Sequence, residues 1–454
     1  MTPVTFKEIY LMSAPQNTPK PQHFPATRQY DSDDFERFRP WDNDPATKDN
    51  ANTQHNIMML VGNGFDIAVL SELNANYLTD YRSFFNHLQM KNFNRDNSLF
   101  KRMDELRRKD EAAETLGEEG YPNWSDFEYL LQEHVDDLST HGGTFYTAQI
   151  KHDLEELQHE FSEFLEMVVS PSILKKLDSE ARDKKWAYRT FANFTADLSE
   201  NDYRTFDLPD RAKHYDVFAF NVVNFNFTPL LENYLSLDQH QFDPHIHKDV
   251  DTNFEFRRNP RNHSFGNYWE SFGNAQTGCS AYLVAEFYHP HGNQHTPRSL
   301  LFGIDADDVT ASRGAPHQMG KPYWAQTPRR YKKMIAETDL FIIFGSSRGT
   351  SDKWWWRHVL KRLAEGGQVI IYQYVPESKK NTISENSIKN EFIRENYDPS
   401  MFGGNPLSES VSFKIFLNIF VVIYSDPSTI SAFGFNKAPY DPTDRNPAKL
   451  PKLQ

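Results

Sequence analysis

The sequence lacks the residues that would cross-link it or carry it into a membrane. It has one cysteine, Cys279, among 454 residues, so it forms no internal disulfide and no zinc ribbon. A membrane-spanning helix needs about 20 mostly apolar residues, and the longest apolar run near the C-terminal end, residues 413–424, is broken by Lys414 and Asn418. Residues 1–28 have no apolar signal-peptide segment. We therefore expect a cytoplasmic protein with no membrane partner.

The chain also has fewer basic residues than acidic residues. The chain has 49 Lys and Arg against 63 Asp and Glu, for a formal net charge of −14. A negative field of this size repels phosphate backbones and anionic lipid surfaces. The composition therefore disfavours a nucleic-acid partner, although 329–333 contains a local group of four basic residues.

Aromatic residues, by contrast, are abundant, with 36 Phe and 21 Tyr in a chain that is 38% hydrophobic. This composition is typical of a globular protein with a large core. The two ends differ: residues 1–53 are rich in Pro, Asp and Asn, and residues 436–454 contain four prolines. Both ends have few aliphatic residues to offset ordering entropy, so we predict poorly ordered tails. An extended arm along the surface is the alternative.

Four short apolar runs each lie beside a turn that contains Gly or Asn, which is typical of buried parallel strands. The predicted strands are residues 57–61, 217–224, 340–344 and 368–372, and the late run 415–424 would make a fifth.

The interval between the first two strands has a different pattern. Apolar side chains recur at helical spacing in 127–138 and 150–168, and Pro171 follows the second stretch. We predict a helical insertion over 74–214 in a domain made of 54–73 and 215–435. Strands separated by long helical spans predict an α/β fold, with a Rossmann-like doubly wound parallel sheet that binds ligands at the carboxyl ends of its strands.

The turn after the first predicted strand carries a G-x-G pattern, Gly62-Asn63-Gly64-Phe65-Asp66. Glycines between a strand and a helix let backbone N–H groups approach an anion. The third glycine of the dinucleotide fingerprint is missing. A tight turn that binds nothing is therefore an equal alternative.

A second glycine turn, Gly345-Ser346-Ser347, follows the third predicted strand. Its hydroxyl groups suit a phosphate or a ribose. The alternative is a Ser- and Thr-rich N-cap for a helix that begins near Asp352. Two such turns on neighbouring strands favour a nucleotide site.

The second predicted strand ends in Asn224-Phe225-Asn226-Phe227-Thr228. With the alternation of a strand, Asn224, Asn226 and Thr228 share one face. Buried amides must be hydrogen-bonded, so they either complete a turn or bind a polar ligand, and we favour the ligand.

His289-Pro290-His291-Gly292 follows an apolar run and offers an imidazole as a general base. A metal site is the competing interpretation, because His245, His247 and His295 with Asp305, Asp307 and Asp308 would add ligands. Ordinary surface histidines are the simplest alternative.

Taken in order, the motifs GNGFD, WSDFE, NFNFT, HPHG, LLFGIDADD and IIFGSSRGTSD make the chain resemble the AbiH-like bacteriophage abortive infection proteins. The resemblance spans residues 56–375. Proteins of this family are in turn distantly similar to the sirtuin superfamily, which implies a Rossmann-like fold that binds NAD.

The sirtuin resemblance implies roles for individual residues. Gly62 and Gly64 match phosphate-binding glycines, Asn226 matches a ribose-contacting asparagine and His291 matches the catalytic histidine. The turn that holds the cofactor corresponds to Gly345, Ser346 and Ser347.

The chain also departs from the sirtuin pattern. Thr228 replaces an acid, Asp66 stands near a serine position, and the structural zinc module is missing. A protein deacylase is therefore disfavoured.

We accordingly predict an antiphage hydrolase that takes NAD as its substrate, cleaves the nicotinamide–ribose bond and needs no metal. The predicted catalytic residues are Asn226 and His291. The predicted cofactor-binding residues are Gly62, Asn63, Gly64, Phe65, Asp66, Asn224, Thr228, Gly345, Ser346 and Ser347. A metal-dependent hydrolase acting on nucleotides or nucleic acid and a non-catalytic nucleotide sensor are the alternatives. A homo-oligomer and a phage-derived trigger are both left open.

Overall fold

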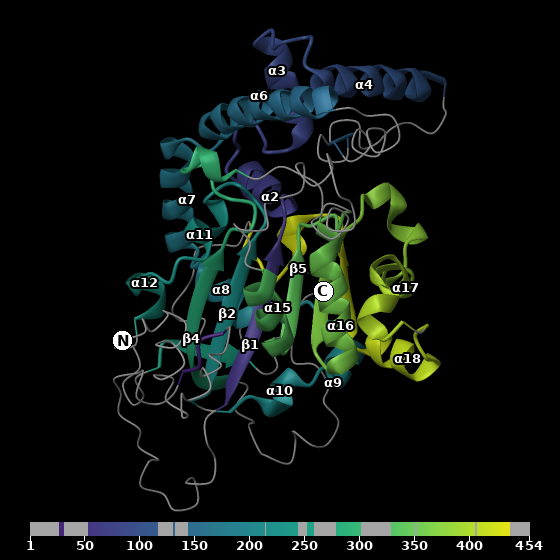
Figure 1. Ribbon diagram of the computed structural model, residues 1–454. Coiled ribbons are helices and arrows are strands. Elements are labelled where there is room, and N and C mark those ends of the chain that lie inside the picture. Colours follow the sequence, from purple (N-terminus) through teal and green to yellow (C-terminus); the bar gives the residue numbers. More distant parts are fainter. Residues whose placement is uncertain are drawn as a thin grey trace, which may run out of the picture.

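A seven-stranded sheet lies at the centre of the protein, with the strand order β3-β4-β2-β1-β5-β6-β7 (Figure 1). The computed structural model describes residues 27–30, 53–116, 130–131, 144–213, 215–243, 252–257, 278–300, 328–349, 352–404 and 406–435. The strands are β1 (Gln54–Val61), β2 (Val217–Asn224), β3 (Phe254–Arg257), β4 (Gly278–Tyr288), β5 (Leu340–Phe344), β6 (Gln368–Tyr374) and β7 (Ile419–Tyr424). The sequence prediction of an α/β fold is confirmed.

The register of the sheet brings the ends of the central strands to one level. Val61 of β1 lies opposite Asn224 of β2 on one side and Phe344 of β5 on the other. Val223 pairs with Tyr288, the last residue of β4. All of these pairs are parallel, so the turns that follow β1, β2, β4 and β5 emerge at the same edge of the sheet.

The central strands are buried on both faces. Ile57, Met59 and Val61 of β1 point into one hydrophobic core, whereas Met58 and Leu60 point into a second. All five side chains are at most 1% exposed. This two-sided burial explains why the strand reads as a continuous apolar run rather than an alternating one.

Helices supply the partner side chains of both cores. The larger core includes residues of α2 (Gly64–Glu72), α7 (Pro171–Asp183), α8 (Trp186–Asn193), α9 (Glu200–Thr205), α10 (Leu208–Arg211), α11 (Leu230–Tyr234) and α12 (Gln239–Phe242). The second core includes residues of α15 (Pro328–Glu337), α16 (Lys353–Glu365), α17 (Glu385–Asn396) and α18 (Glu409–Leu417). Short 3-10 helices lie at Pro297–Ser299, Glu377–Thr382, Pro399–Phe402 and Pro427–Thr429.

Three further helices lie beyond the carboxyl ends of the strands, at the top of Figure 1: α3 (Tyr81–Met90), α4 (Ser98–Leu116) and α6 (Thr144–Val168). Their aromatic side chains join the larger core, where Phe161 of α6 packs edge-on against Phe84 of α3 and Phe227 after β2. The described elements between α2 and β2 are thus all helices. Not all of them lie beyond the strands, because Phe191 of α8 packs on Phe220 of β2.

Two details of the predicted sheet are wrong. The sheet is mixed, because β3 pairs antiparallel with β4 at its edge. The predicted strand 415–424 is also too long, since α18 continues to Leu417 and β7 begins at Ile419. The Ser408 side chain accepts a hydrogen bond from the Val411 N–H and starts this helix. Apolar residues lie on both sides of Asn418, so hydrophobicity alone does not distinguish the helix from the strand.

Several predictions fall outside the described residues. These are most of the two tails, nearly all of the predicted helix at 127–138, and the WSDFE motif. Within the first tail, the described residues 27–30 contact the body of the protein, where the Thr27 N–H donates to Glu337 Oε2 at 2.8 Å. Across the described part of the chain, no helix is both long and apolar enough to cross a membrane.

Candidate functional site at the carboxyl edge of the sheet

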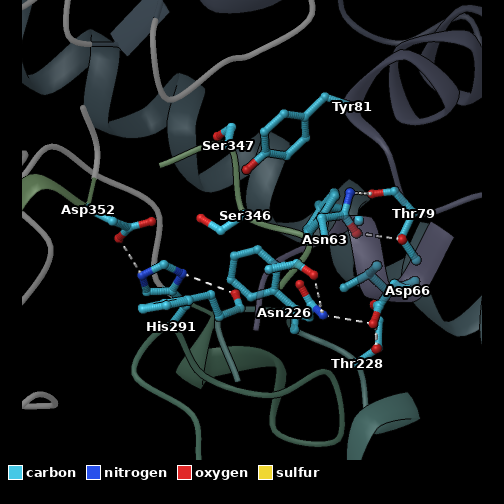
Figure 2. Close-up of a pocket in the computed structure, with 17 residues that line it drawn as sticks. Asn63, Asp66, Thr79, Tyr81, Asn226, Thr228, His291, Ser346, Ser347 and Asp352 are labelled. Carbon is cyan, nitrogen blue, oxygen red and sulfur yellow. Dashed lines mark hydrogen bonds and ion pairs between the residues drawn. The ribbon is translucent and has the colours of Figure 1, made fainter. Parts of the chain in front are cut away.

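A cavity of about 290 Å³ lies where β1, β2 and β5 end (Figure 2). Its walls come from the turns after these strands, from the loop after β4, and from α3 and α6. It is lined by Gly62, Asn63, Gly64, Asp66, Thr79, Tyr81, Phe161, Leu165, Phe225, Asn226, Phe227, Thr228, His291, Gly345, Ser346, Ser347 and Asp352.

The sequence predicted that four distant segments meet here, and they do. Gly64, Asn226, His291 and Ser346 all line the one cavity. Among the predicted site residues, Phe65 and Asn224 are the two that do not line it. Phe65 is fully buried and packs against Tyr234 and other aromatic rings of the larger core.

The two glycine turns pack directly against each other. The Gly64 N–H donates to the Gly345 carbonyl oxygen at 2.8 Å, and the Gly62 N–H donates to Phe344 O at 2.9 Å. A Cβ on Gly345, which has a φ of +66°, would lie 2.5 Å from the Phe65 nitrogen. Glycine is therefore needed for the contact between the turns. This differs from our expectation, because both glycine N–H groups are used by protein carbonyls rather than left for an anion.

Asn63, between the two glycines, is held by Thr79. The Thr79 hydroxyl donates to Asn63 Oδ1 at 2.7 Å, and Asn63 Nδ2 donates to the Thr79 carbonyl at 3.2 Å. This pair connects the β1 turn to the segment that leads into α3, which places Tyr81 at the cavity wall.

Asp66 is a fully buried carboxyl group in the first turn of α2. It accepts hydrogen bonds from Asn226 Nδ2 at 2.8 Å and from the Thr228 hydroxyl at 2.6 Å. Burial raises the pKa of Asp66 to about 8, with a smaller contribution in the same direction from the charge of Glu232, and the two hydrogen bonds oppose this rise. The carboxyl group therefore changes its charge near neutral pH.

Asn226 uses both hydrogens of its amide nitrogen within the protein, one toward Asp66 and one toward the Gly62 carbonyl at 3.3 Å. The side chain can consequently offer a ligand only its carbonyl oxygen, Oδ1, which requires a donor such as a hydroxyl group. Asn224 stabilises the turn that contains Asn226. Its Oδ1 accepts a hydrogen bond from the Asn226 N–H at 3.0 Å, and its Nδ2 donates to Thr228 O. Asn224 therefore completes the turn.

His291 is held at both ring nitrogens. Nδ1 lies 3.1 Å from the Phe225 carbonyl oxygen, and Nε2 lies 2.9 Å from Oδ1 of Asp352. Figure 2 shows this pair on one side of Asn226 and the Asp66 group on the other. Asp352 is the N-cap residue of α16, yet its side chain makes no capping hydrogen bond. Its carboxylate turns to His291 instead.

Besides Phe225 and Phe227, which flank Asn226 in the predicted turn, sequence reasoning missed five lining residues: Thr79, Tyr81, Phe161, Leu165 and Asp352. The sequence around Asp352 is typical of a helix N-cap, and the alternative prediction placed this residue near the start of a helix. The other four lie in the helical stretch after α2, where nothing in the local pattern separates a wall residue from a core residue.

The described lining contains two carboxyl groups, Asp66 and Asp352, and no lysine or arginine. The polar side chains that line this cavity thus include amides, hydroxyls and carboxylates, and such groups suit a ligand rich in hydroxyls. Ser346 contributes such a group: its Oγ accepts the Arg348 N–H at 3.1 Å and keeps its own hydrogen to donate.

The histidine-based metal site finds no support in the described residues. Both ring nitrogens of His291 are engaged, and His289 Nε2 lies 2.5 Å from Oε1 of Glu232. The remaining proposed ligands, with the exception of His295, lie outside the described residues.

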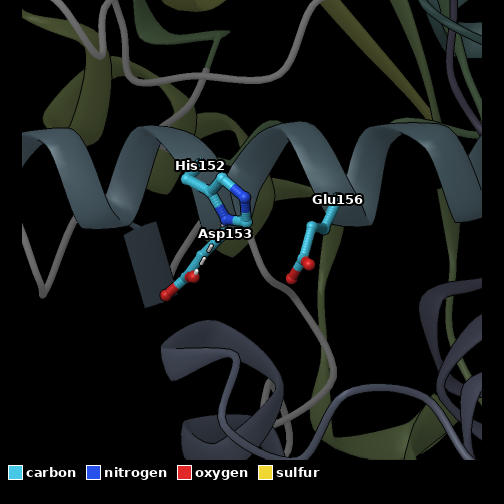
Figure 3. A group of neighbouring side chains, drawn as sticks. All are labelled: His152, Asp153 and Glu156. Atoms are coloured by element: carbon cyan, nitrogen blue, oxygen red, sulfur yellow. Dashed lines mark ion pairs between the residues drawn. The ribbon is translucent and has the colours of Figure 1, made fainter.

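Within the described ranges, three ligand-type side chains come together only at His152, Asp153 and Glu156 on α6 (Figure 3). Asp153 is 1% exposed and accepts hydrogen bonds from the Ser98 N–H and hydroxyl and from Gln149. These contacts hold the start of α4, which accounts for the carboxylate without a metal ion.

The sheet and the cavity define an α/β protein with a cavity at the carboxyl edge of its strands. The family described as bacteriophage abortive infection AbiH matches residues 58–374, a segment that runs from β1 to β6 and includes every turn that lines the cavity. The chain belongs to this family. No curated protein and no solved structure matches the chain.

Proposed function

We propose that this protein acts in abortive infection by binding NAD in the cavity and cleaving its nicotinamide–ribose bond. The observation that carries the proposal is the meeting of the two glycine turns, Asn226 and His291 around one cavity. The sirtuin resemblance assigns each of these pieces to NAD. The shared carboxyl edge of the parallel strands brings the turns together, and the residues that the turns carry support the assignment to NAD.

The strand order supports a dinucleotide. Without the antiparallel β3, the order is β4-β2-β1-β5-β6-β7. The chain builds outward from β1 in one direction through β2 and β4, then returns and builds in the other direction through β5, β6 and β7. This order agrees with that of Rossmann-like doubly wound sheets, which bind dinucleotides at the point where the order reverses, and it supports the proposal of such a fold. The cavity lies at that point, between the ends of β1 and β5.

The size of the cavity indicates which part of NAD it would hold. Small-molecule pockets span roughly 300 to 1,000 Å³, and this cavity of about 290 Å³ is at the lower limit. We assign the nicotinamide ribose to it, with the pyrophosphate directed toward Ser346 and Ser347. The Oδ1 atom of Asn226 would accept a hydrogen bond from a ribose hydroxyl.

Loss of nicotinamide leaves a positive, oxocarbenium-like centre at C1′ of the ribose. Asn226 orients the sugar for this step, and His291 takes part in moving the proton, an effect worth roughly 100- to 10,000-fold in rate. Phe161 and Leu165 on α6 cover the cavity with apolar surface and limit access of bulk water. Depletion of NAD would stop growth of the infected cell before phage release, after a phage-derived trigger.

The test is to incubate the purified protein with NAD and to follow nicotinamide release, with and without a chelator. We expect turnover that a chelator leaves unchanged and that Asn226→Ala and His291→Ala each reduce at least 100-fold. His295→Ala is the matched control, because this histidine of the same loop is exposed.

Equal turnover in the wild type and both variants would contradict the proposal, and turnover that a chelator abolishes would favour a metal-dependent hydrolase. Tight NAD binding without any turnover would favour a nucleotide sensor.

A further inference from the structure

We propose that Asp352 is the catalytic residue that accepts a proton in this cavity and that His291 is the residue that positions it. This inference rests on the proposed function and assigns the proton transfer within it. It reverses the simpler assignment, in which the imidazole itself removes the proton.

The first argument is the position of Asp352 on its helix. Aspartate is among the best N-cap residues, and a capping side chain stabilises a helix. Asp352 occupies the N-cap of α16 but forgoes that hydrogen bond. Its carboxylate instead lines the cavity and contacts His291. The nearby helix N-terminus still favours the ionised carboxylate, through the helix dipole.

The second argument counts protons on His291. A backbone carbonyl only accepts hydrogen bonds, so Nδ1, which faces Phe225 O at 3.1 Å, carries a hydrogen. The contact of 2.9 Å between Nε2 and Asp352 requires a hydrogen between those two atoms as well. While the pair is intact, both ring nitrogens of His291 are therefore engaged, and neither is available to accept a proton from a ligand.

The third argument is access. The side chain of Asp352 is 20% exposed, whereas that of His291 is 6% exposed. The carboxylate is thus the member of the pair that a ligand reaches first. An imidazole that donates to this carboxylate fixes its orientation through a charge-assisted hydrogen bond.

The step balances as a hydrolysis. The oxygen of water forms a bond to C1′ of the ribose while the bond from C1′ to the pyridinium nitrogen breaks. The electron pair of that bond stays on nitrogen, which becomes neutral in free nicotinamide. One proton of the water passes to the Asp352 carboxylate and then to solvent. Carboxylates activate water in the same way in inverting glycosidases, whose transition state is also oxocarbenium-like.

Kinetics of five variants test the assignment, with nicotinamide release measured over a range of NAD concentrations. Asp352→Asn should lower kcat at least 100-fold and change KM by less than about threefold. Asp352→Ser should do the same, and because serine can supply the N-cap hydrogen bond that Asp352 does not make, the melting temperature of this variant should not fall. His291→Gln keeps an N–H donor for the carboxylate and should retain at least ten times the kcat of His291→Ala. Asp238→Asn, in a cap on α12, is the matched control and should match the wild type.

Three results would overturn the inference. The first two concern the role of Asp352, and the third concerns the proposed function as well. An active wild type whose kcat survives Asp352→Asn within threefold, or in which His291→Gln is as inactive as His291→Ala, contradicts the role of Asp352 alone. A wild type that releases no nicotinamide contradicts the proposed function and this inference together. Binding of ADP-ribose, measured by calorimetry for each variant, confirms that the cavity is intact in every comparison.

Discussion

The side-chain amide of Asn226 donates to the carboxyl group of Asp66 at 2.8 Å, across 160 residues of sequence. Asp66 lies in the first turn of the helix after β1, and Asn226 lies in the turn after β2. The bond therefore joins two neighbouring turns and fixes the amide that faces the cavity. Because Asp66 is fully buried, its charge affects the stability of the protein as well as the site.

Asp66 should make stability depend on pH. Burial raises its pKa from 3.8 to about 8, so between these values the folded protein holds a proton that the unfolded chain has lost. Its contribution is fully present below about pH 4, falls as pH rises, and is lost above pH 8. Asp66→Asn cannot lose a proton. The free energy of unfolding of the wild type should therefore fall relative to this variant by roughly 1 kcal/mol for each pH unit between 5 and 8.

Urea denaturation of both proteins at pH 5, 6.5 and 8 measures this difference. A constant difference between the two proteins over that range would show that Asp66 keeps the same charge throughout.

The contact between the glycine turns should not tolerate a methyl group. Gly345→Ala combines a positive φ with a Cβ only 2.5 Å from the Phe65 nitrogen, so we expect a loss of about 3 kcal/mol in the free energy of unfolding. Gly403→Ala is the matched control, because its φ is +76° and nothing lies within 4 Å of the added Cβ. It should cost about 1 kcal/mol. Equal losses in chemical denaturation would mean that the turns can separate freely.

Thr79 should matter for binding more than for turnover. Thr79→Val keeps the shape of the side chain but removes the hydrogen bond to Asn63 Oδ1, at a cost of about 1 kcal/mol in stability. Asn63 then has only one hydrogen bond to Thr79, and we expect KM for NAD to rise severalfold with kcat unchanged. Thr205→Val, which removes a hydroxyl bonded to Asp202 O on an exposed helix, is the control. A large fall in kcat with KM unchanged would contradict a positioning role for Thr79.

The carboxylates of α6 should act as a structural support without a metal. Asp153→Ala leaves the Ser98 N–H without its acceptor at the start of α4, and we expect a loss of roughly 2 kcal/mol. His152→Ala should change little, because that side chain is 64% exposed. Thermal denaturation of the wild type should be the same with and without a chelator. A melting temperature lowered by the chelator, and no longer lowered in His152→Ala, would instead indicate a bound ion.

Much of the sheet could be predicted because strands that are buried on both faces consist of continuous runs of apolar residues, which can be recognised in the sequence. β2 and β5 need apolar residues at nearly every position, and their bounds agree with the predicted strands. Parallel strands share a carboxyl edge, so predicting them also predicted that their polar turns meet. The junction at Asn418 could not be found in this way, since helix and strand are equally apolar there.

The partners of the site residues were not predictable, for a geometric reason. His291 and Asp352 are 61 residues apart, and nothing beside either residue indicates the other. The sequence around Asp352 fits a helix cap, and only the structure shows that its carboxylate points elsewhere. The contact between the glycine turns was not predictable for a similar reason. A G-x-G turn that packs against another turn has the same sequence pattern as one that binds a phosphate.

A crystal structure of the Asp352→Asn variant, soaked with NAD, tests the central claim most directly. The account predicts intact NAD with its nicotinamide ribose in the cavity, one ribose hydroxyl within hydrogen-bond distance of Asn226 Oδ1, and the pyrophosphate beside Ser346 and Ser347. NAD bound at another place, or an unchanged cavity at saturating NAD, would contradict it.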